Sequence, residues 1–406
     1  RKESSAASDV YKRQIYKYVE YDRHLNKKNI DTIHRIISHH YVFIQKLLKK
    51  HNYSFFYGEI AHLHTKLLQE IGSINGMKII WPQISQFGNR FFLLSGNEHA
   101  LSNTIKDHYS NINVNPPTEE EINFSKNYIN ENRSNEDVLK ADYNKDYFLL
   151  KKKKVNISNI KHLHNRLKYN SRLNNDLYAS SLTKIIKNKI SNLKFLTFLN
   201  FKRSSSLFSN YDKSDNYALY FLHYEPDLST LVWAPYFKNQ IELIKKISFS
   251  LPYGMYLYVK EHPLMKDKRN FYHLQEIQKI PQVKLINSTV DSKELIKQSD
   301  FIVTITGTIG WEAILLQKSV IVFGTVFYES YPSVIKFENW TFINKYIEQA
   351  RESKIIEDNE LIKFITAVFR ATYIGDWYKF AVLAIEDKKN TEEVINAFKS
   401  FIRRIE

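Results

Sequence analysis

The sequence contains no cysteine, and only 10 glycines, 9 prolines and 3 methionines among its 406 residues. Without cysteine, the chain can form no disulfide framework and can hold no thiolate-bound zinc or iron–sulfur cluster. Apolar runs are short, and none approaches the roughly 18 residues that would indicate a membrane-spanning helix. We therefore expect a cytoplasmic protein whose stability depends on packed hydrophobic cores.

Hydrophobic residues make up 43% of the chain, and its length suggests two domains. The formal net charge is +16, and its densest point is the run of four lysines at Lys151–Lys154. This run is either a solvated basic face or a surface that attracts anionic lipid headgroups or anionic sugars. The basic residues are not interleaved with a nucleic-acid-binding motif, so we expect no nucleic-acid partner.

The segment Arg1–Gln14 (RKESSAASDVYKRQ) has a different character from the rest. It resembles a translated sequencing-adapter string, and we expect it to be a non-native segment that makes few contacts with the domains. On this hypothesis the N-terminal domain is truncated.

The clearest pattern lies in the second half of the chain, where short apolar runs alternate with amphipathic stretches. Strands are predicted at residues 217–224, 255–260, 283–286, 301–305 and 319–323, and helices at residues 239–250, 271–280, 292–298 and 309–316. Five strands alternating with helices in about 110 residues predict a doubly wound parallel sheet. We assign residues 217–345 to this domain and residues 346–406 to C-terminal helices.

Residues 15–96 carry a weaker version of the same pattern. A strand is predicted at residues 53–57, a helix at residues 60–72 and a second strand at residues 77–81. This strand–helix–strand unit predicts what remains of another Rossmann-like domain. Between residues 97 and 216 the composition shifts to Asn, Lys, Ser and Glu without strand alternation, and we expect a helical insertion or connector there.

Three polar loops follow predicted strands of the second domain: His223–Asp227 (HYEPD), Lys260–Pro263 (KEHP) and Thr306–Glu312 (TGTIGWE). The carboxyl ends of parallel strands lie at one edge of a sheet, so these loops should meet in one crevice, where open α/β sheets bind ligands. Gly307 and Gly310 would let backbone N–H groups approach a phosphate at the start of a helix.

Each of these residues also has a structural interpretation. Lys260 and His262 end a strand where a cation and an imidazole can meet a phosphate, but His262 can equally be a turn residue packed beside Pro263. Glu312 can accept hydrogen bonds from a ribose diol, or it can simply favour the helix dipole. A bare Gly-x-x-Gly turn can also be structural.

A family resemblance is carried by the segments HYEPDLST, LYVKEHP, ELIKQSDFIVTITGTIGWEAILL and VIVFGTVFY. They resemble bacterial capsule polysaccharide biosynthesis proteins, a family that is related to the capsular Kdo transferases and shares the His-Pro motif of bacterial sialyltransferases. The resemblance is strong over residues 217–328 and moderate over residues 54–89. It implies an α/β fold of the GT-B type, with two Rossmann-like doubly wound domains facing a cleft.

The resemblance also implies a function. It is the transfer of a Kdo-like sugar from a CMP-linked nucleotide sugar to a growing glycan or glycolipid at the inner membrane. The nucleotide sugar would be held mainly by the second domain, with no further cofactor. The protein would be cytoplasmic or peripheral on the inner face of that membrane.

Carried over by position, the resemblance assigns roles to individual residues. His262 would contact the donor phosphate and protonate it as it leaves, with Lys260 helping to absorb the negative charge. The residues that would cradle the same phosphate are Thr306, Gly307, Thr308 and Gly310. Glu312 would bind the ribose. Glu225 and Asp227 belong to a loop that more often contains Gln-Pro-Glu in the family, which leaves the role of Asp227 open.

An inverting transfer also needs a general base for the acceptor hydroxyl. The candidate is Glu59, in the predicted strand-to-helix turn of the first domain, although it can equally be a helix N-terminal acid. His62 and His64 lie nearby, but no further ligand accompanies Glu59 and His62, so we expect no metal site.

Two other functions remain open at this stage. A nucleotide-sugar epimerase of the 2-epimerase type would turn over a UDP-sugar without an acceptor. A non-catalytic glycan-binding factor for capsule export would bind nucleotides weakly or not at all.

Overall fold

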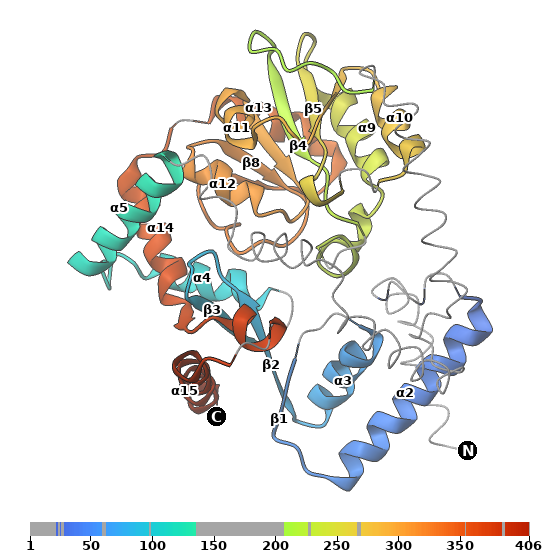
Figure 1. The fold of residues 1–406 in the computed structure, drawn as a ribbon, viewed down its shortest axis with the longest axis vertical. Helices are drawn as coiled ribbons and strands as arrows, with labels where there is room; N and C mark the ends of the chain where they lie inside the picture. The colour runs from blue at the N-terminus through green and yellow to red at the C-terminus, as the bar shows by residue number, and fades with distance from the viewer. Residues whose placement is uncertain are drawn as a thin grey trace, which may run out of the picture.

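The structure is a computed structural model of the chain. It describes residues 22, 25, 28–58, 62–96, 99–134, 207–225, 229–265, 269–353, 355–383 and 386–405. The described chain forms a six-stranded sheet and a four-stranded sheet, seen in the upper and lower parts of Figure 1. Four predicted features lie outside the described residues: Arg1–Gln14, Lys151–Lys154, Glu59 and Asp227.

The six-stranded sheet is parallel throughout, with the order β6-β5-β4-β7-β8-β9. Its strands are β4 (Tyr217–Phe221), β5 (Tyr256–Lys260), β6 (Val283–Ile286), β7 (Phe301–Thr304), β8 (Ser319–Val322) and β9 (Val334–Lys336). From β4 the chain runs outward to β6 and then continues with β7 on the other side of β4. The strand order therefore reverses between β4 and β7, the type of place where doubly wound sheets bind ligands.

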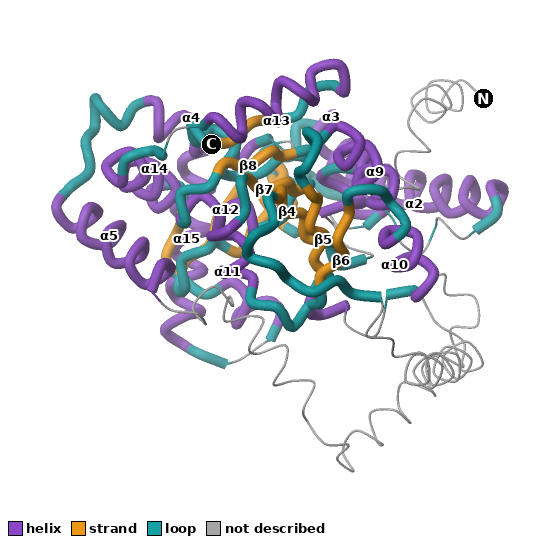
Figure 2. The backbone as a smooth tube through the Cα atoms, turned by 90° about the horizontal axis from the view of Figure 1, so that it is seen from above, coloured by secondary structure: helices purple, strands orange, loops and turns teal. Residues whose placement is uncertain are grey.

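Helices cover both faces of this sheet (Figure 2). One face packs against α9 (Gln240–Ser250), α10 (Phe271–Gln278) and α13 (Ile343–Glu352), and the other against α11 (Ser292–Gln298) and α12 (Ile309–Leu315). Side chains cap three of these helices: Asn239, Asn270 and Asp291 accept hydrogen bonds from first-turn N–H groups. The predicted doubly wound sheet is thus present, with one additional strand, β9. This strand has only three residues, of which one is buried, so its sequence pattern is weak.

The four-stranded sheet has the order β1-β2-β3-β10. Its strands are β1 (Phe55–Tyr57), β2 (Lys78–Ile84), β3 (Arg90–Ser95) and β10 (Thr372–Ile374). The predicted strand–helix–strand unit is present, because β1 and β2 are parallel and are connected through α3 (Leu63–Ile74). The remaining pairs are antiparallel, so the sheet is mixed, and β10 brings the C-terminal part of the chain back to the first domain.

The remaining helices surround and connect the two sheets. They are α2 (Ile30–Lys50), α4 (Ala100–Ser110), α5 (Glu119–Ser134), α14 (Asp358–Arg370) and α15 (Lys388–Ile405), with the short turns η1 (Ser229–Trp233), η2 (Pro235–Phe237), η3 (Pro263–Met265), η4 (Trp340–Phe342) and η5 (Tyr378–Val382). Within the described part of the chain, no helix combines the length and the apolar character needed to cross a bilayer.

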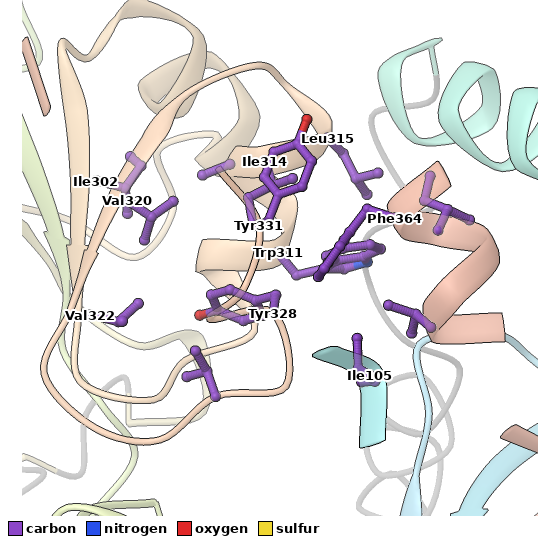
Figure 3. Close-up of a cluster of buried hydrophobic side chains, with 14 of the residues drawn as sticks. Ile105, Ile302, Trp311, Ile314, Leu315, Val320, Val322, Tyr328, Tyr331 and Phe364 are labelled. Carbon is purple, nitrogen blue, oxygen red and sulfur yellow. The ribbon is translucent and has the colours of Figure 1, made fainter. Parts of the chain in front are cut away.

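A shared hydrophobic cluster joins the second domain to the helices of the first (Figure 3). Trp311 of α12 lies between the sheet and α14, where its ring centre is 6.2 Å from that of Phe364. Its indole nitrogen donates a hydrogen bond of 3.0 Å to the hydroxyl of Tyr128 on α5. Ile105 of α4 completes this contact. The two sheets are therefore held in one arrangement by buried packing.

Candidate functional site

The loops after β4, β5 and β7 meet at the point where the strand order reverses. His223, two residues beyond β4, reaches across to the loop after β7. Its Nε2 atom accepts a hydrogen bond of 3.3 Å from the N–H of Ile305 and lies 3.5 Å from the Thr304 hydroxyl. His223 was not among the predicted site residues. Its position as the first polar residue after an apolar strand was the signal that could have identified it.

A buried arginine ties the first loop to the second. The guanidinium of Arg269 donates through Nε to both carboxylate oxygens of Glu261, at 3.1 and 3.0 Å. Its Nη1 donates to Glu225 at 2.9 Å, and its Nη2 donates to the backbone carbonyl of His223 at 2.7 Å. Glu225 also accepts from Gln240 of α9. Glu225, predicted to bind substrate, thus serves this internal network.

The two histidines of the crevice differ in their burial. Burial, together with the positive charges of His262 and Arg269, lowers the pKa of His223 to about 4, so this ring is neutral near pH 7. His262 is only partly buried, and its Nδ1 accepts a hydrogen bond of 3.1 Å from the N–H of Leu264. In a neutral His262 ring the proton is therefore on Nε2. Of the two rings, His262 is the less buried.

Hydrogen bonds with Thr304 and Tyr328 hold the Gly-containing loop in place. The N–H of Gly307 donates to the Thr304 hydroxyl at 3.0 Å, and its carbonyl accepts from the Tyr328 hydroxyl at 2.5 Å. The buried hydroxyl of Thr306 has no partner among the described residues, and Thr308 is exposed. A Cβ atom added to Gly310 would lie 2.2 Å from the Tyr328 hydroxyl oxygen, so Gly310 makes room for that side chain.

The variant Gly310→Ala tests this packing. Because the added methyl group would displace Tyr328 and its bond to Gly307, we expect the free energy of unfolding to fall by about 1–3 kcal/mol. Urea denaturation followed by circular dichroism measures this change. The matched control is Gly88→Ala, since a Cβ there meets no atom within 4 Å. Equal stability of the two variants would contradict the packing role.

Lys260 and Glu312 belong to a charged cluster under the start of α11. Burial lowers the pKa of Lys260 to about 8 against the opposing effect of Asp291 and Glu312, and its ammonium group donates to the Ser292 hydroxyl at 3.0 Å. Burial raises the pKa of Glu312 to about 8, although Lys260 and Lys293 favour the ionised form. Lys260, predicted to balance the charge of the phosphate, and Glu312, predicted to bind the ribose, therefore lie close to each other.

Glu312 makes a testable contribution to the pH dependence of stability. Between the ordinary pKa of a glutamate and about 8, folded Glu312 keeps a proton that the unfolded chain has released, so stability falls as pH rises through this window. We expect Glu312→Gln to flatten this decline, measured as the urea midpoint from pH 5 to 8. The exposed control Glu352→Gln should keep the wild-type slope, and a wild-type slope in Glu312→Gln would contradict the assigned pKa.

A cleft with a volume of about 190 Å³ lies between the two sheets. The first domain lines it with side chains of β2, β3 and α4, including Trp81, Gln83 and Phe92. The second domain contributes Trp233 of η1, the loop residues Thr306 and Thr308, and a segment from Thr325 to Tyr328. The rings of Trp81 and Trp233 are stacked, with centres 5.1 Å apart and planes inclined by 12°.

The predicted site residues are therefore only partly assembled around this cleft. Thr306 and Thr308 line it, whereas His262, Lys260 and Glu312 do not. Gly307 connects the two regions, because its chain neighbours line the cleft and its Cα faces the His223 ring: a Cβ added there would be 3.5 Å from His223 Cε1.

The first-domain histidines form a group of stacked rings. His64 lies 5.7 Å from His62 and 6.2 Å from His40, measured between ring centres. Burial, His62 and His40 lower the pKa of His64, and Asp22 opposes them. Among the described residues, no group of three or more His, Asp or Glu side chains is placed to hold a metal ion.

Together, these features define an α/β protein with a crevice of polar loops at the reversal point of a doubly wound sheet and a cleft beside it. The chain belongs to the capsule polysaccharide biosynthesis protein family, since a sequence model of that family matches residues 111–365. No curated protein matches the chain.

Several solved structures have a similar but distant overall shape. The KpsC beta Kdo 2,4 transferase of Thermosulfurimonas dismutans is 12% identical, with 79% of this chain and 80% of that chain covered and a TM-score of 0.44. The beta Kdo 2,7 transferase of the same organism's KpsC is 15% identical, with 84% and 88% covered and a TM-score of 0.37. The UDP-GlcNAc 2-epimerase from Methanocaldococcus jannaschii is 13% identical, with 85% and 82% covered and a TM-score of 0.33.

Proposed function

We propose that this protein is a glycosyltransferase of surface polysaccharide assembly, which transfers a sugar from a nucleotide sugar to a glycan or glycolipid. The observation that carries this proposal is the convergence of three polar loops at the strand-order reversal. His223 connects the loop after β4 to the loop after β7, and Arg269 connects the loop after β4 to the loop after β5. Doubly wound sheets bind nucleotides at such crevices. Membership of the capsule family supplies the biological setting.

His262 is the proposed acid at the donor phosphate. The hydrogen bond from Leu264 to its Nδ1 leaves the hydrogen of the neutral ring on Nε2, which can donate a hydrogen bond to an oxygen of the departing phosphate. To protonate that oxygen, the ring would first take up a second proton at Nδ1 and give up the bond from Leu264. The low pKa of His223 excludes this buried ring as a proton donor near pH 7. His223 instead fixes the loop after β7 through its bond to Ile305.

The rest of the donor site follows from the family resemblance. Thr306, Gly307, Thr308 and Gly310 would surround the phosphate. The buried hydroxyl of Thr306, which has no partner among the described residues, could donate to it if the side chain turned outward. A Glu312 with a pKa near 8 can both donate and accept hydrogen bonds, which suits a ribose diol. Lys260 would add positive charge beneath the site. We propose a CMP-linked, Kdo-like donor.

The acceptor side is proposed on the first domain, with Glu59 as general base. The reaction would be inverting and metal-independent, because a protonated His262 and backbone N–H groups would stabilise the leaving phosphate. Lys151–Lys154 would draw the protein to anionic lipid at the inner face of the membrane.

The test is a transfer assay with CMP-, UDP-, GDP- and dTDP-sugars, each with and without a lipid-linked or oligosaccharide acceptor. We expect acceptor-dependent release of nucleotide with one donor class, and a product whose mass has increased by one sugar. Conversion of a UDP-sugar into its epimer without acceptor would instead establish the epimerase alternative. Absence of both turnover and nucleotide binding would favour a glycan-binding export factor.

A further inference from the structure

The described residues that line the cleft between the sheets carry no formal charge. They combine aromatic and aliphatic side chains with amides and hydroxyls, and no Asp, Glu, Lys or Arg is among them. This is unusual for a chain with a formal net charge of +16. The carboxylate of an acidic sugar bound in this cleft would lose its water shell without gaining a cationic partner from the described lining, which is strongly unfavourable.

Two buried polar atoms of cleft residues lack hydrogen bonds. They are the indole nitrogen of Trp81 and the hydroxyl of Thr306, and neither has a partner among the described residues. Buried polar groups are nearly always hydrogen-bonded in folded proteins, so unsatisfied ones need an explanation. Both atoms are covered by other protein atoms, so a ligand hydroxyl could pair with them only if the two side chains turned towards the cleft. These two residues come from opposite walls, β2 and the loop after β7.

We propose that this cleft binds a neutral sugar ring of the acceptor glycan, an assignment that rests on the transferase function proposed above. The C–H face of a pyranose is apolar and packs against aromatic side chains such as Trp233 and Phe92. Its hydroxyls match the amides of Gln83 and Gln86 and the hydroxyl of Thr325. An acyl chain would leave these amides unsatisfied, and an acidic sugar would leave its carboxylate unpaired.

The position of the cleft indicates that the sugar bound there belongs to the acceptor and not to the donor. Seven of its fifteen lining residues come from β2, β3 and α4, whereas the proposed phosphate site belongs to the second domain alone. Thr306 and Thr308 flank Gly307, so a sugar in the cleft would lie next to the proposed site of the leaving phosphate. This is the position from which an acceptor hydroxyl can approach the donor.

The test measures saccharide binding to the full chain by saturation-transfer NMR and by tryptophan fluorescence. The neutral probes are methyl glucoside, methyl galactoside and lactose, and the acidic probes are glucuronate and N-acetylneuraminate. We expect a neutral probe to bind, and Trp233→Ala to weaken its binding by about tenfold or more through loss of the stacking surface. Gln83→Leu, which keeps the side-chain volume, should weaken it as well. The control is Tyr236→Ala, which removes a 93% exposed aromatic side chain three residues from Trp233.

Nucleotide binding, measured separately, distinguishes the possible failures. One outcome is that the protein binds a neutral sugar through Trp233 but binds no nucleotide. This result would refute the transferase function and support the cleft assignment. Transfer activity that is unchanged in both Trp233→Ala and Gln83→Leu would refute the cleft assignment and keep the transferase. Preference for the acidic probes, absence of binding by every neutral probe, or competition between nucleotide alone and the neutral probe would also overturn the assignment.

Discussion

Replacement of His262 by alanine is expected to lower the rate of sugar transfer by about 10²–10⁴-fold, the range typical of a residue in acid–base catalysis. The physical reason is that this ring can hydrogen-bond the leaving phosphate through Nε2 and, in its imidazolium form, protonate it, whereas the neighbouring His223 has a pKa of about 4. The measurement is the single-turnover rate at saturating donor, so that weaker donor binding does not contribute.

The control for this variant is His39→Ala on the exposed surface of α2, where the ring bonds to the carbonyl of Arg35 in its own helix and to no other described residue. It should transfer sugar at the wild-type rate. A His262→Ala enzyme with more than a tenth of the wild-type rate would exclude the acid role and leave His262 as a turn residue beside Pro263.

Removal of the Arg269 side chain is expected to have the largest effect on stability. In Arg269→Met the buried carboxylate of Glu261 loses its cation, and breaking such a buried pair costs about 3–5 kcal/mol. The side chains of Arg269 and Glu261 are only 2% and 4% exposed, so water cannot replace the lost partner. Burial already raises the pKa of Glu261 and Arg269 opposes this rise, so the variant should be less stable still at high pH. Urea unfolding at pH 6 and pH 8 measures both effects.

Two further variants separate a charge effect from a packing effect. Adding Glu261→Gln to Arg269→Met removes the stranded carboxylate, and we expect part of the lost stability to return. The control Lys279→Met breaks an exposed ion pair with Glu276 and should change stability by less than about 1 kcal/mol. A loss below about 1 kcal/mol in Arg269→Met would contradict the proposed importance of the network.

The second sheet was largely predictable because its strands are buried on both faces. The run at residues 301–305 is apolar and β-branched, and its position agrees with β7 to within one residue. Caps such as Asp291 also leave a direct sequence signal at a helix start. In contrast, β3 and β10 were missed, because their pairing joins residues far apart in the chain and has no local signature.

The site was predictable only where a loop directly follows a strand. The three loops could be expected to converge from the parallel topology alone, and in the structure His223 and Glu261 do meet through Arg269. Arg269 itself was not predicted, because it lies nine residues beyond β5 and its partners come from two loops. The family resemblance implied a cleft between two domains, but its lining could not be predicted, since the stacking of Trp81 on Trp233 depends on how the domains pack together.

The central claim is that the crevice between the ends of β4, β5 and β7 binds the nucleotide of an activated sugar. Its most direct test is the melting temperature of the protein with CMP, UDP, GDP or dTDP, in the wild type and in His262→Ala. Ligand binding stabilises the folded state by about 2.7 kcal/mol at a concentration one hundred times Kd. The account predicts a rise in melting temperature with one of these nucleotides, CMP by our proposal, and a smaller rise in His262→Ala. A folded wild-type protein whose melting temperature none of the four nucleotides raises would contradict it.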